Sequence, residues 1–271
     1  MANTSINLDD KFNIKKSNVL LNGTQGLVRL MLGQKIRDEK QGLNTAGFVT
    51  GYRGSPLGAV DFQMRRASKE LLASNIKFKE ALNEDLATTA LWGAQQAELR
   101  GEGLYDGVFG LWYGKGPGVD RSGDAMRHAN MAGSSVNGGV LMAMGDDHSG
   151  ESSTVLHQSD LAMIDAGMPI LSPAGVQEIL DYGYYGFALS RYSGLWVGLK
   201  TMKDTIEVTS VVDGDPFRMS FKNPKPKSGA DNLNIRLVDT PAEQEKRLLS
   251  DKKIAAEEFA RIYRIDKVGL P

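Results

Sequence analysis

A run of turn-forming residues that includes a cation and a hydroxyl follows a short apolar segment. The apolar segment is 46–49, and the run is Gly51-Tyr52-Arg53-Gly54-Ser55-Pro56-Leu57-Gly58. In open α/β sheets, ligands bind in the crevice at the carboxyl ends of the strands, where glycine lets the backbone come close to them. Arg53 and Ser55 favour a phosphorylated cofactor or a small acid as the ligand. An ordinary strand-to-helix turn explains the same run equally well.

Three further polar segments lie where other elements are expected to begin or end. They are Asn83-Glu84-Asp85, the loop Tyr113-Gly114-Lys115-Gly116-Pro117-Gly118, and the segment Gly145-Asp146-Asp147-His148-Ser149. If these segments meet the carboxyl ends of parallel strands, they converge on one rim of the sheet. For Lys115, the flanking glycines and proline favour a loop that approaches a ligand over a solvated lysine.

Glu84 has two interpretations. Asn83 followed by acidic residues is typical of a helix N-terminus, where an asparagine caps the first turn and carboxylates are stabilised by the helix dipole. Glu84 also lies between Leu82 and Leu86. If this apolar stretch buries it, Glu84 could share a proton with a heterocyclic nitrogen.

Several common catalytic patterns are missing. No Gly-x-Gly-x-x-Gly follows an expected strand, and 110–116 fails the P-loop pattern because no Ser or Thr follows Lys115. Ser55 is not in a Gly-x-Ser-x-Gly elbow. A metal-dependent α/β enzyme that uses Asp146, Asp147 and His148 stays open as an alternative, although their spacing matches no recognised metal site.

Short apolar runs alternate with segments of helical period over residues 18–204. The apolar runs are 46–49, 107–112, 139–144, 169–171 and 195–199. The helical segments are 23–41, 57–74, 85–100, 119–132, 158–166 and 176–190. Because continuously apolar runs are typical of strands buried on both faces, we predict an α/β domain with a doubly wound, mostly parallel sheet and helices on both faces.

The composition changes on either side of this domain. We expect 1–17 to be an N-terminal extension and 205–241 to hold connecting strands and a linker, rich in Pro, Lys and Gly, at 223–229. A helix is expected within 242–271 and has no evident partner. We therefore predict that it begins a following domain that is truncated here.

The overall composition fits an ordinary globular protein. The chain has 271 residues, of which 41% are hydrophobic and 24% charged, with a net charge of -1. This balance argues against nucleic acid or an anionic membrane as a partner. The chain has no cysteine, so it has neither a disulfide nor a cysteine-ligated iron–sulfur cluster. Because residues 1–16 lack the apolar core of a signal peptide, we predict a cytoplasmic protein.

The motifs above occur together, and in the same order, in a known enzyme family. Residues 51–58, 83–87, 112–124 and 145–158 resemble indolepyruvate ferredoxin oxidoreductase in its long, fused bacterial form. The resemblance runs from about residue 20 to residue 200 and continues more weakly through 233–241. The family is a thiamine diphosphate-dependent 2-oxoacid:ferredoxin oxidoreductase, and the matched part is its pyrimidine-binding domain.

The resemblance implies roles for individual residues. Glu84 would be the catalytic glutamate that hydrogen-bonds N1′ of the aminopyrimidine ring and relays the proton needed to activate the thiazolium carbon. The residues expected to contact the cofactor are Gly51, Tyr52, Arg53, Gly54, Ser55, Pro56, Asn83, Asp85, Lys115, Gly116 and Pro117. The substrate would be bound by Arg53, Ser55, Arg127 and His148, with Arg53 or Arg127 on its carboxylate.

The implied reaction is the oxidative decarboxylation of an aryl 2-oxoacid to acyl-coenzyme A and carbon dioxide, with electrons passing to ferredoxin. The chain lacks the Gly-Asp-Gly motif that holds the diphosphate and Mg²⁺, and it lacks cysteines for [4Fe-4S] clusters. The resemblance therefore implies a separate diphosphate-binding domain or subunit, a homo-oligomer in the complete form, and a 271-residue chain that is inactive alone. A non-catalytic interaction module of the same fold stays open as an alternative.

Overall fold

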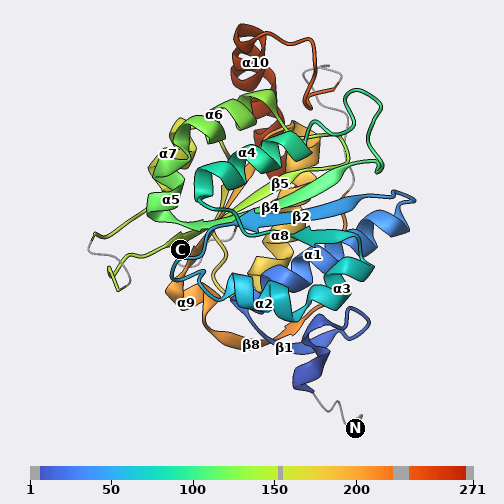
Figure 1. Ribbon diagram of the computed structural model, residues 1–271, viewed down its shortest axis with the longest axis vertical. Coiled ribbons are helices and arrows are strands. Elements are labelled where there is room, and N and C mark those ends of the chain that lie inside the picture. Colours follow the sequence, from blue (N-terminus) through green and yellow to red (C-terminus); the bar gives the residue numbers. More distant parts are fainter. Residues whose placement is uncertain (1–6, 152–154, 222–231, 267–271) are drawn as a thin grey trace.

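The computed structural model describes residues 7–151, 155–221 and 232–266, and these build a six-stranded parallel sheet in the order β3-β2-β4-β5-β7-β6 (Figure 1). The strands are β2 (Ala46–Gly51), β3 (Ile76–Phe78), β4 (Val108–Lys115), β5 (Val140–Asp146), β6 (Ile170–Leu171) and β7 (Val197–Met202). All five neighbouring pairs are parallel. The predicted doubly wound, parallel α/β sheet is confirmed.

Helices cover both faces of the sheet. One layer holds α1 (Gly23–Lys40), α2 (Val60–Arg66), α3 (Ser68–Ala73) and α8 (Val176–Ser193), and the other holds α4 (Glu84–Ala94), α5 (Gly116–Arg121), α6 (Gly123–Ala132) and α7 (Asp160–Asp165). Alternate residues of a strand point to opposite faces. Thus Leu111 packs in the first layer, whereas Trp112 packs in the second with Leu91 and Met126.

Local signals fix the ends of the long helices. Asn22 accepts a hydrogen bond from the backbone N–H of Gln25, and the Gln25 side chain accepts one from the backbone N–H of Asn22, which starts α1. Gly194 has a φ of 73° and ends α8. The helix expected at 57–74 begins only at Val60, because residues 56–59 still belong to the preceding turn. No helix of the described residues is long and apolar enough to cross a membrane.

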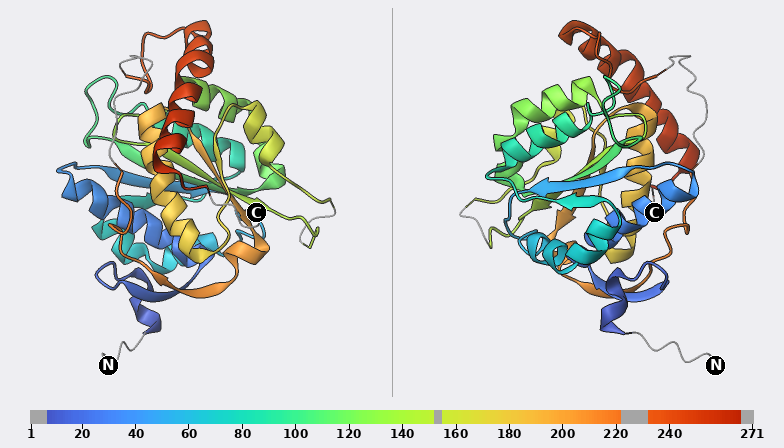
Figure 2. Two further views of the ribbon diagram at one scale, coloured as in Figure 1. Left: turned by 180° about the vertical axis from the view of Figure 1, so that it is seen from behind. Right: turned by 45° about the vertical axis from the view of Figure 1, so that its right-hand side comes forward.

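Segments from both ends of the chain pack beside the first helical layer (Figure 2). Strand β1 (Asn18–Asn22) pairs antiparallel with β8 (Thr209–Asp213) as a separate ladder, near η1 (Leu8–Phe12) and α9 (Lys203–Ile206). At the C-terminal side, α10 (Pro241–Arg247), the π-helical turn Leu248–Lys252 and α11 (Lys253–Tyr263) form one continuous helical segment.

The C-terminal helix shares the core of the α/β domain. Phe259 of α11 is fully buried and lies 5.0 Å, centroid to centroid, from the ring of Tyr185 on α8. The helix for which the sequence indicated no partner therefore packs against α8. The division into separate domains stays a prediction, and the expected linker at 223–229 lies outside the described residues.

Buried arginines tie the peripheral segments to the first layer. Arg29 of α1 is fully buried, and its guanidinium donates to the backbone carbonyls of Lys11, Asn13, Lys16 and Gly214. Burial lowers the pKa of Arg29, and nearby acidic groups oppose that shift. Arg37 donates to two further carbonyls, those of Pro216 and Met219. The extension before β1 and the segment after β8 are held by these contacts.

Candidate functional site

The strand order reverses between β2 and β4, which marks one position on the rim of the sheet. From β2 the chain passes to β3 on one side, and then returns to place β4 on the other side of β2. In open parallel sheets, ligands bind in the crevice at such a switch point. The turn 51–58 follows β2 and the loop at Lys115 follows β4, so both predicted segments lie at this switch point.

The turn 51–58 lies across the ends of three strands. The backbone N–H of Tyr52 donates to the Tyr113 carbonyl at 3.1 Å, and the Cα of Gly54 lies against the Lys115 side chain. The Ser55–Pro56 peptide bond is cis, and Pro56 is buried against Gly145 at the end of β5. Arg53 and Ser55 are exposed on this turn. The turn therefore contacts the end of β4 that carries Lys115.

Glu84 is a buried carboxylate at the first position of α4. The Asn83 side chain caps the helix by accepting from the Leu86 N–H at 2.9 Å. Glu84 is only 9% exposed, and its backbone carbonyl accepts hydrogen bonds from Trp112 Nε1 and the Thr88 hydroxyl. No group of the described residues donates a hydrogen bond to its carboxylate. The Glu84 carboxylate can therefore accept a hydrogen bond from a ligand.

The first turn of α5 is enclosed on two sides. A Cβ atom on Gly118 would lie 2.6 Å from Glu84 Oε1, and one on Gly116 would collide with Nδ1 of His157. The sequence Gly116-Pro117-Gly118 thus lets the Glu84 carboxyl group and the His157 imidazole both approach the backbone. Pro117 is exposed at the start of the helix, where its missing N–H costs no hydrogen bond.

The residues of the metal alternative do not form a metal site. Asp146 accepts hydrogen bonds from the backbone N–H and the hydroxyl of Ser159, and it lies 3.8 Å from Lys200 Nζ. Asp147 accepts from the backbone N–H of Glu151, whereas His148 is exposed. In residues 7–151, 155–221 and 232–266, no group of three His, Cys, Asp or Glu side chains is placed to bind a metal ion. Asp146 instead closes the base of the loop after β5.

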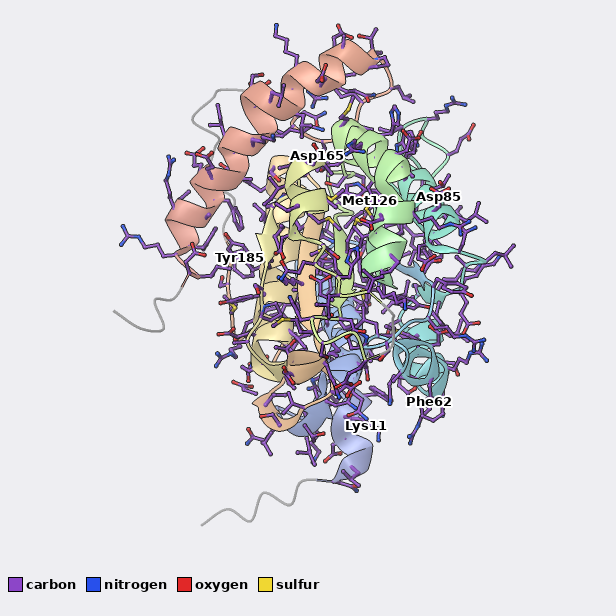
Figure 3. All side chains as sticks on the ribbon, turned by 90° about the vertical axis from the view of Figure 1, so that its left-hand side faces the viewer. Lys11, Phe62, Asp85, Met126, Asp165 and Tyr185 are labelled. Atoms are coloured by element: carbon purple, nitrogen blue, oxygen red, sulfur yellow. The ribbon has the colours of Figure 1, made fainter. Side chains whose placement is uncertain are left out.

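Arg127 is placed apart from the crevice. Its guanidinium forms an ion pair with Asp165, which is labelled in Figure 3, and the pair joins α6 to α7 on the outside of the second layer. Both side chains of this pair are more than half exposed. Of the two arginines expected on the substrate carboxylate, only Arg53 lies on the turn that borders the crevice.

Sequence reasoning missed an acidic cluster behind the turn 51–58. Asp61 of α2 is 8% exposed, and burial, followed by the effect of Glu80, raises its pKa. Glu80 is bound by Arg65 Nη2 at 2.5 and 2.6 Å, and this hydrogen bonding lowers the pKa of Glu80. The Tyr113 hydroxyl lies near Asp61, and burial, with Asp61, raises its pKa. These residues come from α2, β4 and the loop after β3, so no local motif could have indicated them.

His157 and its partner Asp120 were also missed as a pair. The sequence places His157 in a loop 37 residues from Asp120, and no motif spans that separation. In the structure, His157 Nε2 lies 2.9 Å from Asp120 Oδ2. The pair connects the loop after β5 to helix α5, beside the predicted residues Lys115 and Gly116.

Two sequence relatives of this chain carry the same name. No family model matches the chain. It is 27% identical to the indolepyruvate oxidoreductase subunit IorA of Pyrococcus horikoshii over 227 residues, which is 83% of this chain and 31% of that protein. The IorA subunit of Pyrococcus abyssi is 27% identical over 245 residues, 89% of this chain and 34% of that protein. The names of these relatives, together with the fold, support the 2-oxoacid:ferredoxin oxidoreductase superfamily for this chain.

A solved structure from this superfamily has the same fold. It is the 2-oxoglutarate:ferredoxin oxidoreductase from Magnetococcus marinus with 2-oxoglutarate, coenzyme A and succinyl-CoA bound. The TM-score is 0.61 at 16% sequence identity, and the match covers 93% of this chain and 46% of that chain. The present chain spans about a third of the length of the curated superfamily members that it matches.

Proposed function

We propose that this chain is the pyrimidine-binding part of a thiamine diphosphate-dependent 2-oxoacid:ferredoxin oxidoreductase of the indolepyruvate type. The observation that carries the proposal is Glu84, a buried carboxylate beside the topological switch point whose oxygens receive no hydrogen bond from the described residues. The names of the Pyrococcus relatives support the indolepyruvate type. The complete enzyme would convert an aryl 2-oxoacid to acyl-coenzyme A and carbon dioxide and reduce ferredoxin.

The residues present fit thiamine diphosphate. Gly118 has no side chain, so the Glu84 carboxyl group packs directly against its backbone, and an aminopyrimidine ring nitrogen would hydrogen-bond this carboxylate. Bound thiamine diphosphate would supply the carbanion chemistry of decarboxylation. Glu84 would hold and pass one proton at its carboxylate oxygen, and Asn83 would fix Glu84 by capping α4. The turn 51–56 and the loop Lys115-Gly116-Pro117 would line the site.

The substrate is proposed to bind on the turn after β2. Arg53 and Ser55 are exposed there, so a guanidinium and a hydroxyl lie at the surface of the rim. Guanidinium groups bind carboxylates through two parallel hydrogen bonds, which suits the carboxylate of a 2-oxoacid. Arg127 is the weaker candidate because Asp165 already pairs with it. His148 is exposed in the loop after β5 and stays a candidate for substrate contact.

The remaining parts of the reaction are proposed to lie on other domains or subunits. This chain has no Gly-Asp-Gly sequence for the diphosphate and Mg²⁺ and no cysteine for [4Fe-4S] clusters. Leu82, Leu86 and Tyr52, at 85%, 48% and 42% exposure, surround Glu84 and the turn with apolar surface. A diphosphate-binding domain would cover this surface, and a homo-oligomeric complete enzyme would act on coenzyme A and ferredoxin.

The Glu84→Gln variant of the complete enzyme tests the proposal. Because glutamine cannot relay the proton, we expect kcat to fall about 10²- to 10⁴-fold, with little change in the KM for the 2-oxoacid. Thiamine diphosphate affinity, read from quenching of tryptophan fluorescence, should also fall. Glu102→Gln, at an exposed carboxylate in the loop before β4, is the matched control.

Two results would contradict the proposal. Unchanged turnover in E84Q would exclude the proton relay and favour the non-catalytic interaction module. Reduction of ferredoxin or a viologen dye by the purified 271-residue chain, given an indole-bearing 2-oxoacid, would show that no other domain is needed.

A further inference from the structure

We propose that His157, held by Asp120, is a positioning residue for Glu84 and acts through the Gly116-Pro117-Gly118 turn. The inference rests on the proposed role of Glu84. It deepens that role, because it states what keeps the Glu84 carboxyl group at a fixed distance from the crevice.

The loop that carries His157 is anchored at its base. The His157 backbone N–H donates to the Asp147 carbonyl at 3.2 Å, forming a single antiparallel bridge. Two residues further on, the hydroxyl of Ser159 donates to the buried Asp146 carboxylate at 2.5 Å. Lys200 of the neighbouring strand lies 2.5 Å from Asp160. His157 therefore extends from a fixed loop end.

The imidazole ring of His157 is fixed by one partner and by one contact. Its Nε2 lies 2.9 Å from Asp120 Oδ2, and because a carboxylate accepts, Nε2 donates to it. The side chain is 14% exposed, so Asp120 holds the ring largely shielded from water. In the neutral ring the other nitrogen, Nδ1, is then an acceptor; it is buried without a hydrogen-bond partner in the described part of the chain and packs against Gly116.

Glu84 occupies the opposite side of the same turn. A Cβ atom on Gly118 would lie 2.5 Å from Glu84 Cγ and 2.6 Å from its Oε1. The carbonyl of Gly118 accepts from the Ser122 hydroxyl at 2.8 Å, which holds the turn as one unit. A displacement of the turn at Gly116 would therefore move Gly118 relative to the Glu84 carboxyl group.

We expect the contact between the His157 ring and Gly116, held by the His157–Asp120 pair, to matter more for function than for folding stability. Asp120 is 63% exposed, and an ion pair or hydrogen bond at such a site adds little to stability. Positioning is more sensitive than stability, because a shift of about 1 Å in a reacting group costs up to roughly 100-fold in rate. We expect loss of His157 to affect turnover and cofactor affinity more than the unfolding temperature.

The first experiment is a double-mutant cycle between His157 and Glu84 in the complete enzyme. His157→Ala alone should lower kcat ~10- to 100-fold and weaken thiamine diphosphate binding, with the KM for the 2-oxoacid nearly unchanged. In the E84Q background, H157A should add little, because the group that it positions is already gone. His157→Gln, which keeps a donor toward Asp120, should recover part of the loss.

The outcomes separate this inference from the proposed function. If E84Q turns over normally, both are overturned. If E84Q is impaired but H157A lowers kcat by the same factor in the E84Q background as in wild type, His157 acts independently of Glu84. In that case only the inference is overturned. If H157A lowers the unfolding midpoint but leaves kcat and cofactor affinity unchanged, His157 is structural and the inference also fails.

A second cycle tests the contact itself without relying on turnover. Gly116→Ala should weaken thiamine diphosphate binding by displacing the imidazole ring, and it should be nearly harmless in the H157A background, where the space is free. Gly123→Ala is the matched control, because its Cβ would meet only Arg127 Nη1 at 3.7 Å. Equal loss of binding from G116A in both backgrounds would overturn the inference.

Discussion

The buried arginines of the first helical layer and the rim of the sheet differ in how their buried polar atoms are hydrogen-bonded. The guanidinium of Arg29 donates to four backbone carbonyls, and Arg191 binds both carboxylate oxygens of Asp38 at 2.6 and 2.8 Å. At the rim, Nδ1 of His157 is buried with no hydrogen-bond partner among the described residues. Paired groups hold the fold, and an unpaired group at the rim is a candidate for binding a ligand, although the Tyr184 hydroxyl and Trp196 Nε1 are also buried without a partner inside the described core.

The largest expected effect comes from removing a buried group whose hydrogen bonds are satisfied within the protein. Arg29→Met removes the donors that hold the carbonyls of Lys11, Asn13, Lys16 and Gly214. Because buried acceptors would be left unpaired, the free energy of unfolding should fall by about 3 to 5 kcal/mol in urea titration. Arg261→Met, at a 78% exposed side chain, should change it by less than about 0.5 kcal/mol. If both variants lost a similar amount of unfolding free energy, the Arg29 hydrogen bonds would not be what stabilises the fold.

A pair of glycine substitutions sharpens the comparison. Gly33→Ala places a methyl group into the buried hydroxyl of Tyr184, and overpacking there should cost about 1 to 3 kcal/mol of unfolding free energy. Gly118→Ala presses instead on the Glu84 carboxyl group at the rim, so it should weaken thiamine diphosphate binding by more than it lowers stability. Urea unfolding and cofactor titration of both variants provide the measurement, and the reverse pattern would contradict the functional reading of the rim.

The fold and part of the site were predictable from local patterns. Continuously apolar runs such as 139–144 indicated central strands, and Asn83-Glu84-Asp85 indicated the start of a helix that the structure has at Glu84. The Arg29 contacts were not predictable, because backbone carbonyls accept hydrogen bonds whatever their side chains are. His157 and Asp120 escaped for a related reason: their pairing depends on where the loop after β5 meets helix α5, and neither residue has a sequence signature of its own.

Lys252 is another buried, hydrogen-bonded side chain, and its contribution to the free energy of unfolding depends on pH. It is fully buried, and its Nζ donates to the Met131 and Ala132 carbonyls at the end of α6 at 2.9 and 3.2 Å. Burial, with Arg247 nearby, lowers the pKa of Lys252 to about 7 from 10.5. Above pH 7 the unfolded chain keeps a proton that the folded chain has released, so stability should rise with pH toward 10.5.

The Lys252→Met variant isolates this contribution. Between pH 7 and about pH 8.5, wild type should gain about 1 to 2 kcal/mol of unfolding free energy relative to K252M, measured by urea titration at each pH. Lys246→Met, at the exposed side chain of α10, is the control and should show no such slope relative to wild type. A wild-type advantage that shrinks as pH rises would contradict the lowered pKa.

The smallest effect tests whether every unpaired buried group marks a ligand site. Both carboxylate oxygens of Glu98 are buried and lack partners in the part of the chain that the structure describes, although Glu98 lies near the start of β4, away from the rim. Burial raises the pKa of Glu98, so the folded chain binds more protons than the unfolded chain above pH 4.5 and loses stability as pH rises through that window.

Glu98→Gln should therefore stabilise the chain near pH 8. Allowing for solvent screening, we expect a gain of about 0.5 to 1 kcal/mol, which should shrink toward pH 4. Glu102→Gln, at an exposed neighbour in the same loop, should show no comparable gain in urea titrations. A gain confined to acidic pH would instead show that the Glu98 carboxylate is stabilised by its surroundings.

The β1–β8 ladder sets an order of events during synthesis. Its strands, such as Val19 and its partner Val212, stand about 190 residues apart in the chain, and Gly214, an acceptor of Arg29, is equally late. At a translation rate of roughly 5 to 20 residues per second, β1 waits about 10 to 40 s for its partner. For that time the apolar side chains of Val19 and Leu21 and an unpaired strand edge are open to other chains on the ribosome. The nascent chain is thus most exposed to aggregation before residue 214 emerges, while the central sheet already has most of its strands.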